Sequence, residues 1–176
     1  GVFVDALSSS DVNPMRNQVN ESHHEEKFEH MKETKKHQRE VKSNILCLVA
    51  ILRERGNNHD KSKLEDPELT GYAKQKKELN RVKYGSDEWK KQRKKIEPML
   101  NHHYEKNRHH PERFENQIND MNIVDIIEML CDWYDACNRT EDGDIYQSIE
   151  YNQERFGFSD DLKDILINTV KLLDNE

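Results

Sequence analysis

The sequence contains few cysteines, with three among 176 residues. Cys47, Cys131 and Cys137 lie in apolar segments and show no CxxC spacing, so we interpret them as buried, unpaired thiols. Unpaired thiols are typical of a reducing compartment. We therefore expect a cytoplasmic protein.

A long hydrophobic run is also missing. The longest unbroken apolar stretch, residues 45–52, has eight residues, far fewer than the roughly 20 needed to cross a bilayer. Residues 1–20 have neither the basic n-region nor the apolar h-region of a secretory signal. The sequence predicts no membrane span, and we expect residues 1–20 to be a flexible N-terminal segment or an artificial remnant.

An excess of positive charge is absent as well. Lys and Arg number 28 against 35 Asp and Glu, which gives a formal net charge of −7 and argues against an extended nucleic-acid surface. A small anionic ligand stays compatible with local Lys and Arg. Only 33% of the residues are hydrophobic, but they gather in periodic blocks, which predicts a folded chain rather than disorder. The length suits one domain, which we place at residues 21–176.

Hydrophobic periodicity predicts an all-α bundle of about six helices, with no strand. The first helix covers residues 21–55 and ends at Gly56. Its apolar stripe recurs at steps of four and three: Val41, Ile45, Leu48 and Leu52. Residues 45–52 are apolar all round, so we expect them at the centre of the domain. His37 lies one turn before this stripe and on the same face.

Capping and turn residues predict the other helices. Their expected ranges are residues 66–80, 86–109, 122–138, 144–156 and 159–173. The second of these ranges has an inward stripe that includes His103, so His102 is expected to point elsewhere. It ends before His110, because Pro111 disfavours a helical conformation there.

Acidic residues follow one face of the predicted 122–138 helix. They are spaced three and four apart: Asp125, Glu128, Asp132 and Asp135. Because most of the remaining helix surface is apolar, we expect Glu128 and Asp132 to be partly buried. Burying a carboxylate is costly unless a cation lies against it, and a metal ion is the strongest such cation. We therefore favour a metal ligand for Asp132, while a solvated face suits Asp135 and a helix cap suits Asp125.

Nine histidines are a high count for this length, and six of them form adjacent pairs. The pairs are His23-His24, His102-His103 and His109-His110. Imidazoles combined with carboxylates suit Mn, Fe, Co, Ni or Mg better than a sulfur-rich zinc site does. A lone inward histidine such as His37 is more often a core residue than a ligand, so its interpretation depends on its neighbours.

The ordered set His37, His59-Asp60 and Asp132 resembles the signature of the HD superfamily of metal-dependent phosphohydrolases. That signature is a histidine on one helix, a His-Asp doublet after the next turn, and a distant aspartate. His37 precedes the doublet by 22 residues, Asp132 follows it by 72, and the likeness covers residues 21–138. The stretches NHDKSKLEDPEL and HHYEKNRHHPERF also look like a family of small bacterial and phage proteins that implies no established activity.

The resemblance implies a first divalent ion held by four residues: His37, His59, Asp60 and Asp132. It also implies that His103 and His110 hold a second ion. Lys63, three residues after Asp60, matches a phosphate-contacting lysine of many superfamily members, whereas nucleotidase-like members carry glutamate there. Glu68 matches a downstream acid of the nucleotidases, but a favourable charge in the first turn of a helix explains it equally well.

The implied function is hydrolysis of a nucleotide or other small phosphoester by metal-activated water. Lys63, Arg108 and Arg139 would balance the phosphoryl charge, with Glu128 beside the reacting groups, although Arg108 is equally well explained as a surface arginine. Two other functions fit the same residues. One is a non-catalytic metal protein that binds a nucleotide or a host factor. The other is a di-iron oxygenase of the HD fold. An oligomer is compatible with each.

Overall fold

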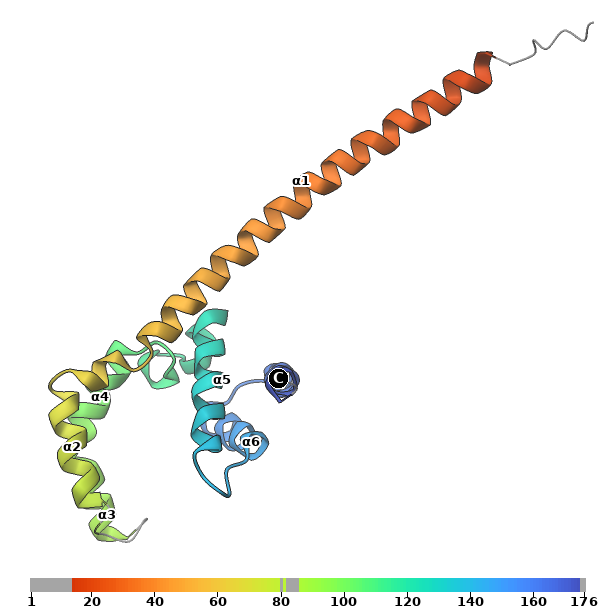
Figure 1. Ribbon diagram of the computed structural model, residues 1–176. Coiled ribbons are helices and arrows are strands. Elements are labelled where there is room, and N and C mark those ends of the chain that lie inside the picture. Colours follow the sequence, from red (N-terminus) through yellow and green to blue (C-terminus); the bar gives the residue numbers. More distant parts are fainter. Residues whose placement is uncertain (1–13, 80, 82–85, 175–176) are drawn as a thin grey trace, which may run out of the picture. The chain divides into compact units, whose positions relative to one another are not determined.

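The computed structural model describes residues 14–79, 81 and 86–174, whose regular secondary structure is all helical, with no strand among them (Figure 1). The prediction of an all-α fold is confirmed. The α-helices are α1 (Pro14–Asn58), α2 (Glu68–Leu79), α3 (Asp87–Lys95), α4 (Glu97–Lys106), α5 (Ile123–Asn138), α6 (Ile145–Phe156) and α7 (Asp160–Leu173). Three short 3-10 helices are η1 (Lys61–Leu64), η2 (Pro111–Arg113) and η3 (Gln117–Asp120). No helix in the described ranges is long and apolar enough to cross a membrane.

The chain divides into two units, Gly1–Val49 and Ala50–Glu176. The described part of the first unit is α1 alone, and the second unit holds the end of α1 and every other helix. The sequence prediction of one domain over residues 21–176 treats these two units as one.

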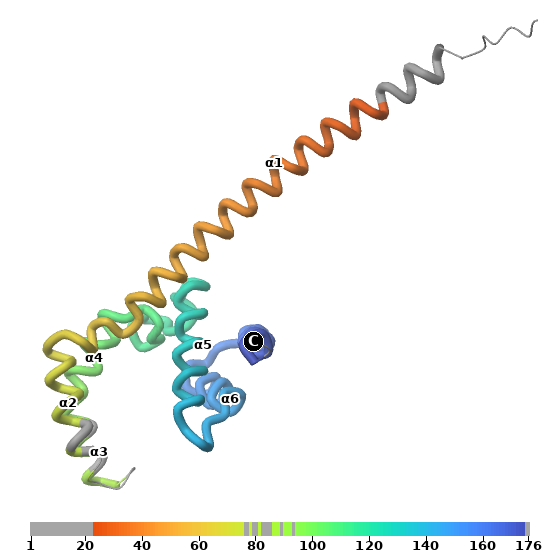
Figure 2. The backbone as a smooth tube through the Cα atoms, in the orientation of Figure 1, coloured from red at the N-terminus to blue at the C-terminus, as the bar shows by residue number. Residues whose placement is uncertain are grey.

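Helix α1 is longer than the sequence analysis predicts, and Figure 2 traces it as one continuous coil. It begins at Pro14, a residue suited to the first turn of a helix, and it continues through Gly56. Residues 45–51 are exposed and Leu52 is half-buried, which contradicts the prediction that residues 45–52 lie at the centre of the domain. Ile45 and Val49 are 54% and 51% exposed.

The predicted third helix is two helices, α3 and α4, separated at Ile96. Pro98 explains the break, since a proline lacks the N–H of a helical hydrogen bond and its ring clashes with the carbonyl of Lys94. Helix α4 packs against α2 so closely that a Cβ atom at Gly71 would overlap the sulfur of Met99. This packing brings the first turn of α2 near the end of α4.

Helices α5, α6 and α7 begin at the predicted caps and enclose the core. Asn122 and Asp125 form a capping box at the start of α5, and Gly157 ends α6 with a φ of 66°, the left-handed region that favours glycine. The core side chains share almost complete burial and come from these helices and their loops: Met129, Leu130, Ile149, Phe158, Leu166 and Val170. The core fixes one face of α5 and leaves the acidic face directed elsewhere.

The three cysteines are free, but they are not buried as the sequence analysis predicts. Cys47 and Cys131 are exposed, and Cys137 is half-buried. Cys47 lies on the uncovered helix of the first unit, and Cys131 lies beside the core face of α5 rather than on it. Apolar neighbours in the sequence therefore did not indicate which face the thiols occupy.

Candidate metal centre

Residues from four segments of the second unit converge on one centre. His59 and Asp60 follow the end of α1, His103 lies on α4, His109 and His110 form the loop before η2, and Asp132 lies on α5. Asp60 turns the chain from α1 into η1 in a left-handed conformation, with a φ of 55°. Aspartate tolerates this conformation better than most residues do.

The potential ligand atoms form two groups in which all of them lie within 4.8 Å of one another. The groups are Asp60 with His103, His109 and His110, and His59 with His109 and Asp132. Asp60 Oδ1 lies 3.3 Å from His103 Nε2 and 3.5 Å from His109 Nε2. Asp132 Oδ1 lies 3.5 Å from His59 Nε2. Neighbouring ligands of an octahedral ion with bonds of about 2.1 Å are about 3 Å apart, so these separations suit one or two ions.

Three buried atoms at this centre lack a hydrogen-bond partner of good geometry. They are Asp60 Oδ1 and both ring nitrogens of His109. A buried polar atom without a partner costs free energy and calls for an explanation such as an ion. These atoms without a partner fit a divalent metal ion. A donor set made only of nitrogen and oxygen atoms fits such an ion as well.

Glu128 fixes the orientation of two imidazoles. Its Oε1 lies 2.9 Å from His59 Nδ1 and 3.0 Å from His109 Nδ1, and its Oε2 accepts a hydrogen bond of 2.6 Å from Arg55. A carboxylate at Nδ1 leaves Nε2 as the free ligand atom, which is the usual support of a metal-binding histidine. Glu128 therefore has a positioning role in this structure, whereas the sequence predicts a place beside the reacting groups.

Glu68 fixes the orientation of two imidazoles on α4. It is completely buried, and its two oxygens each lie 2.8 Å from a histidine Nδ1, one of His103 and one of His102. Ser62 donates a further hydrogen bond of 3.0 Å to it. The expectation that His102 points elsewhere is wrong, because the carboxylate of α2 lies within reach of both imidazoles of the pair.

The pKa values at the centre favour the ligand forms of Asp60 and His110, whereas His59 must lose a proton to bind an ion. Burial would raise the pKa of Asp60, but its contacts with a histidine and a lysine outweigh burial and hold the pKa well below its usual range. Hydrogen bonds to Asp132 and Glu128 raise the pKa of His59 to about 10. Burial lowers the pKa of His110 to about 3, so this imidazole is neutral. Ionised carboxylates around a neutral imidazole attract a cation.

The three cations predicted to contact phosphate each have a carboxylate partner. Lys63 pairs with Asp60, and Arg139 pairs with Asp135. Arg108 donates two hydrogen bonds, of 3.0 and 2.8 Å, to Asp125. Their role as phosphate contacts stays a prediction.

Among the predicted ligands, His37 differs from the others in its place. It is an exposed residue of α1 in the first unit, and both groups of ligand atoms among the described residues belong to the second unit. Its ligand role stays a prediction. His109 is the reverse case, because the sequence analysis selected only His110 from this pair, yet His109 is 1% exposed and belongs to both groups.

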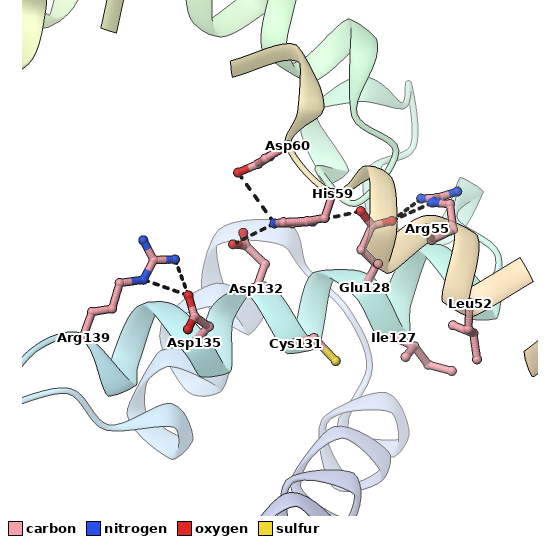
Figure 3. Close-up of a pocket in the computed structure, with 11 residues that line it drawn as sticks. Leu52, Arg55, His59, Asp60, Ile127, Glu128, Cys131, Asp132, Asp135 and Arg139 are labelled. Carbon is pink, nitrogen blue, oxygen red and sulfur yellow. Dashed lines mark hydrogen bonds and ion pairs between the residues drawn. The ribbon is translucent and has the colours of Figure 1, made fainter. Parts of the chain in front are cut away.

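A pocket of about 470 Å³ opens beside the centre (Figure 3). His59, Asp60 and Asp132 form part of its wall. The remaining lining residues come from the end of α1 and from α5 with its C-terminus: Leu52, Arg55, Gly56, Ile127, Glu128, Cys131, Asp135 and Arg139. A ligand of the centre can therefore extend into a space large enough for a small molecule.

The model of DUF5662, a family of unknown function, matches residues 20–172. The chain belongs to the DUF5662 family. It matches no curated protein and no solved structure significantly. The whole His/Asp centre lies within the residues matched by DUF5662, but the match contains no link to the HD superfamily.

Glu128 provides a direct test of the centre in this DUF5662 chain. Glu128→Gln keeps the side-chain shape, but the amide nitrogen cannot accept, so either the hydrogen bond with His59 or the one from Arg55 is lost, together with the negative charge beside His109. We expect the affinity for Mn²⁺ or Co²⁺ to fall about 10- to 100-fold, as is usual when a carboxylate that supports a ligand is lost. Competition with a chelating dye measures this affinity. Asp135→Asn, on the exposed face of the same helix, is the matched control, and equal affinities in the two variants would contradict the positioning role.

Proposed function

We propose that this protein is a metal-dependent phosphohydrolase that acts on a nucleotide or another small phosphoester. The observation that carries the proposal is the convergence of four imidazoles and two carboxylates beside an open pocket. The order of His59-Asp60 and Asp132 along the chain, which resembles the HD signature, supports the same reaction class.

The donor set supports Mn, Fe, Co, Ni or Mg as the ion. No cysteine belongs to either group of ligand atoms in the described residues, and nitrogen and oxygen donors suit these metals. Asp60 presents Oδ1 to His103 and His109, and its Oδ2 lies 3.6 Å from His59 Nε2. A carboxylate that faces imidazoles with both oxygens is compatible with either one bound ion or two.

A bound divalent ion supplies Lewis acidity and a nucleophilic water near neutral pH. The residues of the chain supply the geometry. Asp60, Asp132 and the histidines hold the ion, Glu128 and Glu68 keep the rings in place, and the pocket holds the organic part of the substrate beside the ion. Rigid support of this kind matters because a small displacement of reacting groups lowers the rate strongly.

A di-iron oxygenase is a further candidate function that is compatible with the same donor set. Four of the six donor residues are histidines, a proportion that suits iron as well as it suits Mn or Co. Oxygen consumption by the iron-loaded protein separates this candidate from the hydrolase.

The proposal is tested by elemental analysis of the full chain purified without chelator, followed by a phosphoester screen. We expect at least one equivalent of a divalent metal, and phosphate release from nucleotides or aryl phosphates in the presence of Mn²⁺, Co²⁺, Ni²⁺ or Mg²⁺. Bound metal with no turnover of any phosphoester would overturn the hydrolase and leave a metal-containing binding protein. Absence of bound metal after loading would overturn every function built on the centre.

A further inference from the structure

We infer that the ligand of this centre has an apolar body and a single oxyanion head, and that a second negative charge on the body prevents binding. The inference rests on the proposed function for the head, which the metal ion would bind. It extends that function by naming the chemistry of the rest of the molecule.

The arrangement of the pocket supports an elongated ligand that is anchored at one place. In Figure 3 the Asp135–Arg139 pair lies at one end of the drawn residues and Leu52 and Ile127 lie at the other, with His59 and Asp132 between them. The volume of about 470 Å³ lies within the usual range of small-molecule sites. A head at the ion therefore leaves room for a body of about ring size.

The charges of the pocket argue against a polyanion. Of the four carboxylates that line it, Asp60 and Asp132 would be neutralised by the ion, and Glu128 and Asp135 face the two lining arginines, Arg55 and Arg139. Both arginines are already held by carboxylates, Arg55 by Glu128 and Asp125, and Arg139 by Asp135. Away from the ion, a second negative charge on the ligand would therefore gain no unpaired cation among the lining residues and would lie beside carboxylates, which opposes binding.

The apolar wall provides the complementary attraction. Leu52 and Ile127 are half-buried and Cys131 is exposed, so all three side chains keep surface that a ligand can cover. Removal of about 60 Å² of apolar surface from water is enough for a tenfold gain in affinity. A single aromatic ring presents that area easily.

Three phosphonates, which cannot be hydrolysed as esters, test the inference with Mn²⁺-loaded protein. Phenylphosphonate and methylphosphonate differ in the apolar body, and 4-phosphonobenzoate adds a distant carboxylate to the phenyl ring. By titration calorimetry we expect phenylphosphonate to bind at least about tenfold more tightly than either of the other two. Equal affinities for phenylphosphonate and methylphosphonate, equal or tighter binding of 4-phosphonobenzoate, or no binding of any of the three would each overturn the inference.

A variant pair assigns the effect to the pocket. Ile127→Trp fills the apolar wall and is expected to weaken phenylphosphonate binding about tenfold while methylphosphonate binding stays within about twofold. Ile123→Trp is the control, since Ile123 lies on the same helix, is 54% exposed and does not line the pocket. If Ile127→Trp does not fold, Cys131→Trp at an exposed pocket position replaces it. Unchanged binding in the folded pocket variant would overturn the inference.

Turnover of phenyl phosphate separates this inference from the proposed function. Pocket-dependent phenylphosphonate binding without hydrolysis of phenyl phosphate would leave the ligand class standing and overturn the hydrolase. Hydrolysis of nucleoside triphosphates in preference to phenyl phosphate would do the opposite.

Discussion

Asp60→Asn protein is expected to purify without metal and to release no phosphate above background. Asp60 directs one oxygen toward His103 and His109 and the other toward His59, so the substitution removes a negative charge that faces three of the four imidazoles. Asparagine tolerates the left-handed backbone of this position, with its φ of 55°, as well as aspartate does. The loss can therefore be assigned to the carboxylate rather than to a distorted turn.

Elemental analysis and phosphate release, measured on the same preparations, test this expectation. Asp135→Asn is the control, because Asp135 lines the same pocket but belongs to neither ligand group. Circular dichroism shows whether both variants keep their helices. An Asp60→Asn protein with full metal content would contradict the assignment of the centre, and one with full metal content and full turnover would contradict the hydrolase too.

The second large effect is a loss of stability in Asp125→Ala. Asp125 is completely buried and accepts hydrogen bonds from Arg108, while Arg55 Nη2 lies 2.9 Å from its Oδ1. It also accepts from the backbone N–H of Asn122 in the capping box of α5. We expect the free energy of unfolding to fall by about 3 kcal/mol, the lower end of the range for breaking a buried ion pair. The lower end applies because Arg55 keeps its ion pair with Glu128 and because the side chain of Arg108 is 40% exposed to solvent.

Urea denaturation of the wild type and Asp125→Ala measures this change. Asp135→Ala provides the comparison, since its partner Arg139 is exposed and an exposed pair on one helix contributes less than about 1 kcal/mol. Equal midpoints for wild type and Asp125→Ala would show that the buried pair with Arg108 does not hold the start of α5.

The sequence predicts the C-terminal helices closely because their ends depend on local chemistry. Asn122, Asp144 and Ser159 each accept a hydrogen bond from a backbone N–H of the first helical turn, and Gly157 takes the left-handed conformation at the end of α6. Such signals act within three or four residues, so they can be recognised in the sequence without knowledge of the tertiary structure.

The differences between the predicted helices and the observed α1, α3 and α4 also have local causes. A glycine inside a long helix costs only about 1 kcal/mol, so Gly56 did not end α1. Pro98 is the stronger signal, and its missing N–H divides the predicted third helix into α3 and α4. Periodicity of the apolar residues runs across both positions and could not reveal either outcome.

The candidate site was accessible from the sequence in part. The His59-Asp60 doublet and Asp132 come together in space, and the inward direction of His103 follows from its helical stripe. The contribution of His109 depends on the conformation of a loop, for which periodicity gives no signal. The contacts of Glu128 with the two imidazole rings depend on tertiary packing and could not be predicted either.

The number of residues between His37 and His59 bears on whether the two histidines can share an ion. An α-helix rises 1.5 Å per residue, so the 22 residues between His37 and His59 span about 33 Å if the helix is unbroken. A shared ion and a continuous helix are therefore difficult to combine within one chain. Helix length favours the imidazoles of the second unit as partners of His59.

His109 belongs to both ligand groups, but its Nε2 has a single lone pair and can serve only one ion at a time. If this nitrogen binds the same ion as Asp60, His103 and His110, that ion has four donor residues. The other ion then has only His59 and Asp132. Two ions bound together would then differ in how readily they exchange with solution. Scarce metal fills the richer position first, so the metal concentration at which the weaker position fills sets the threshold for any chemistry that needs both ions.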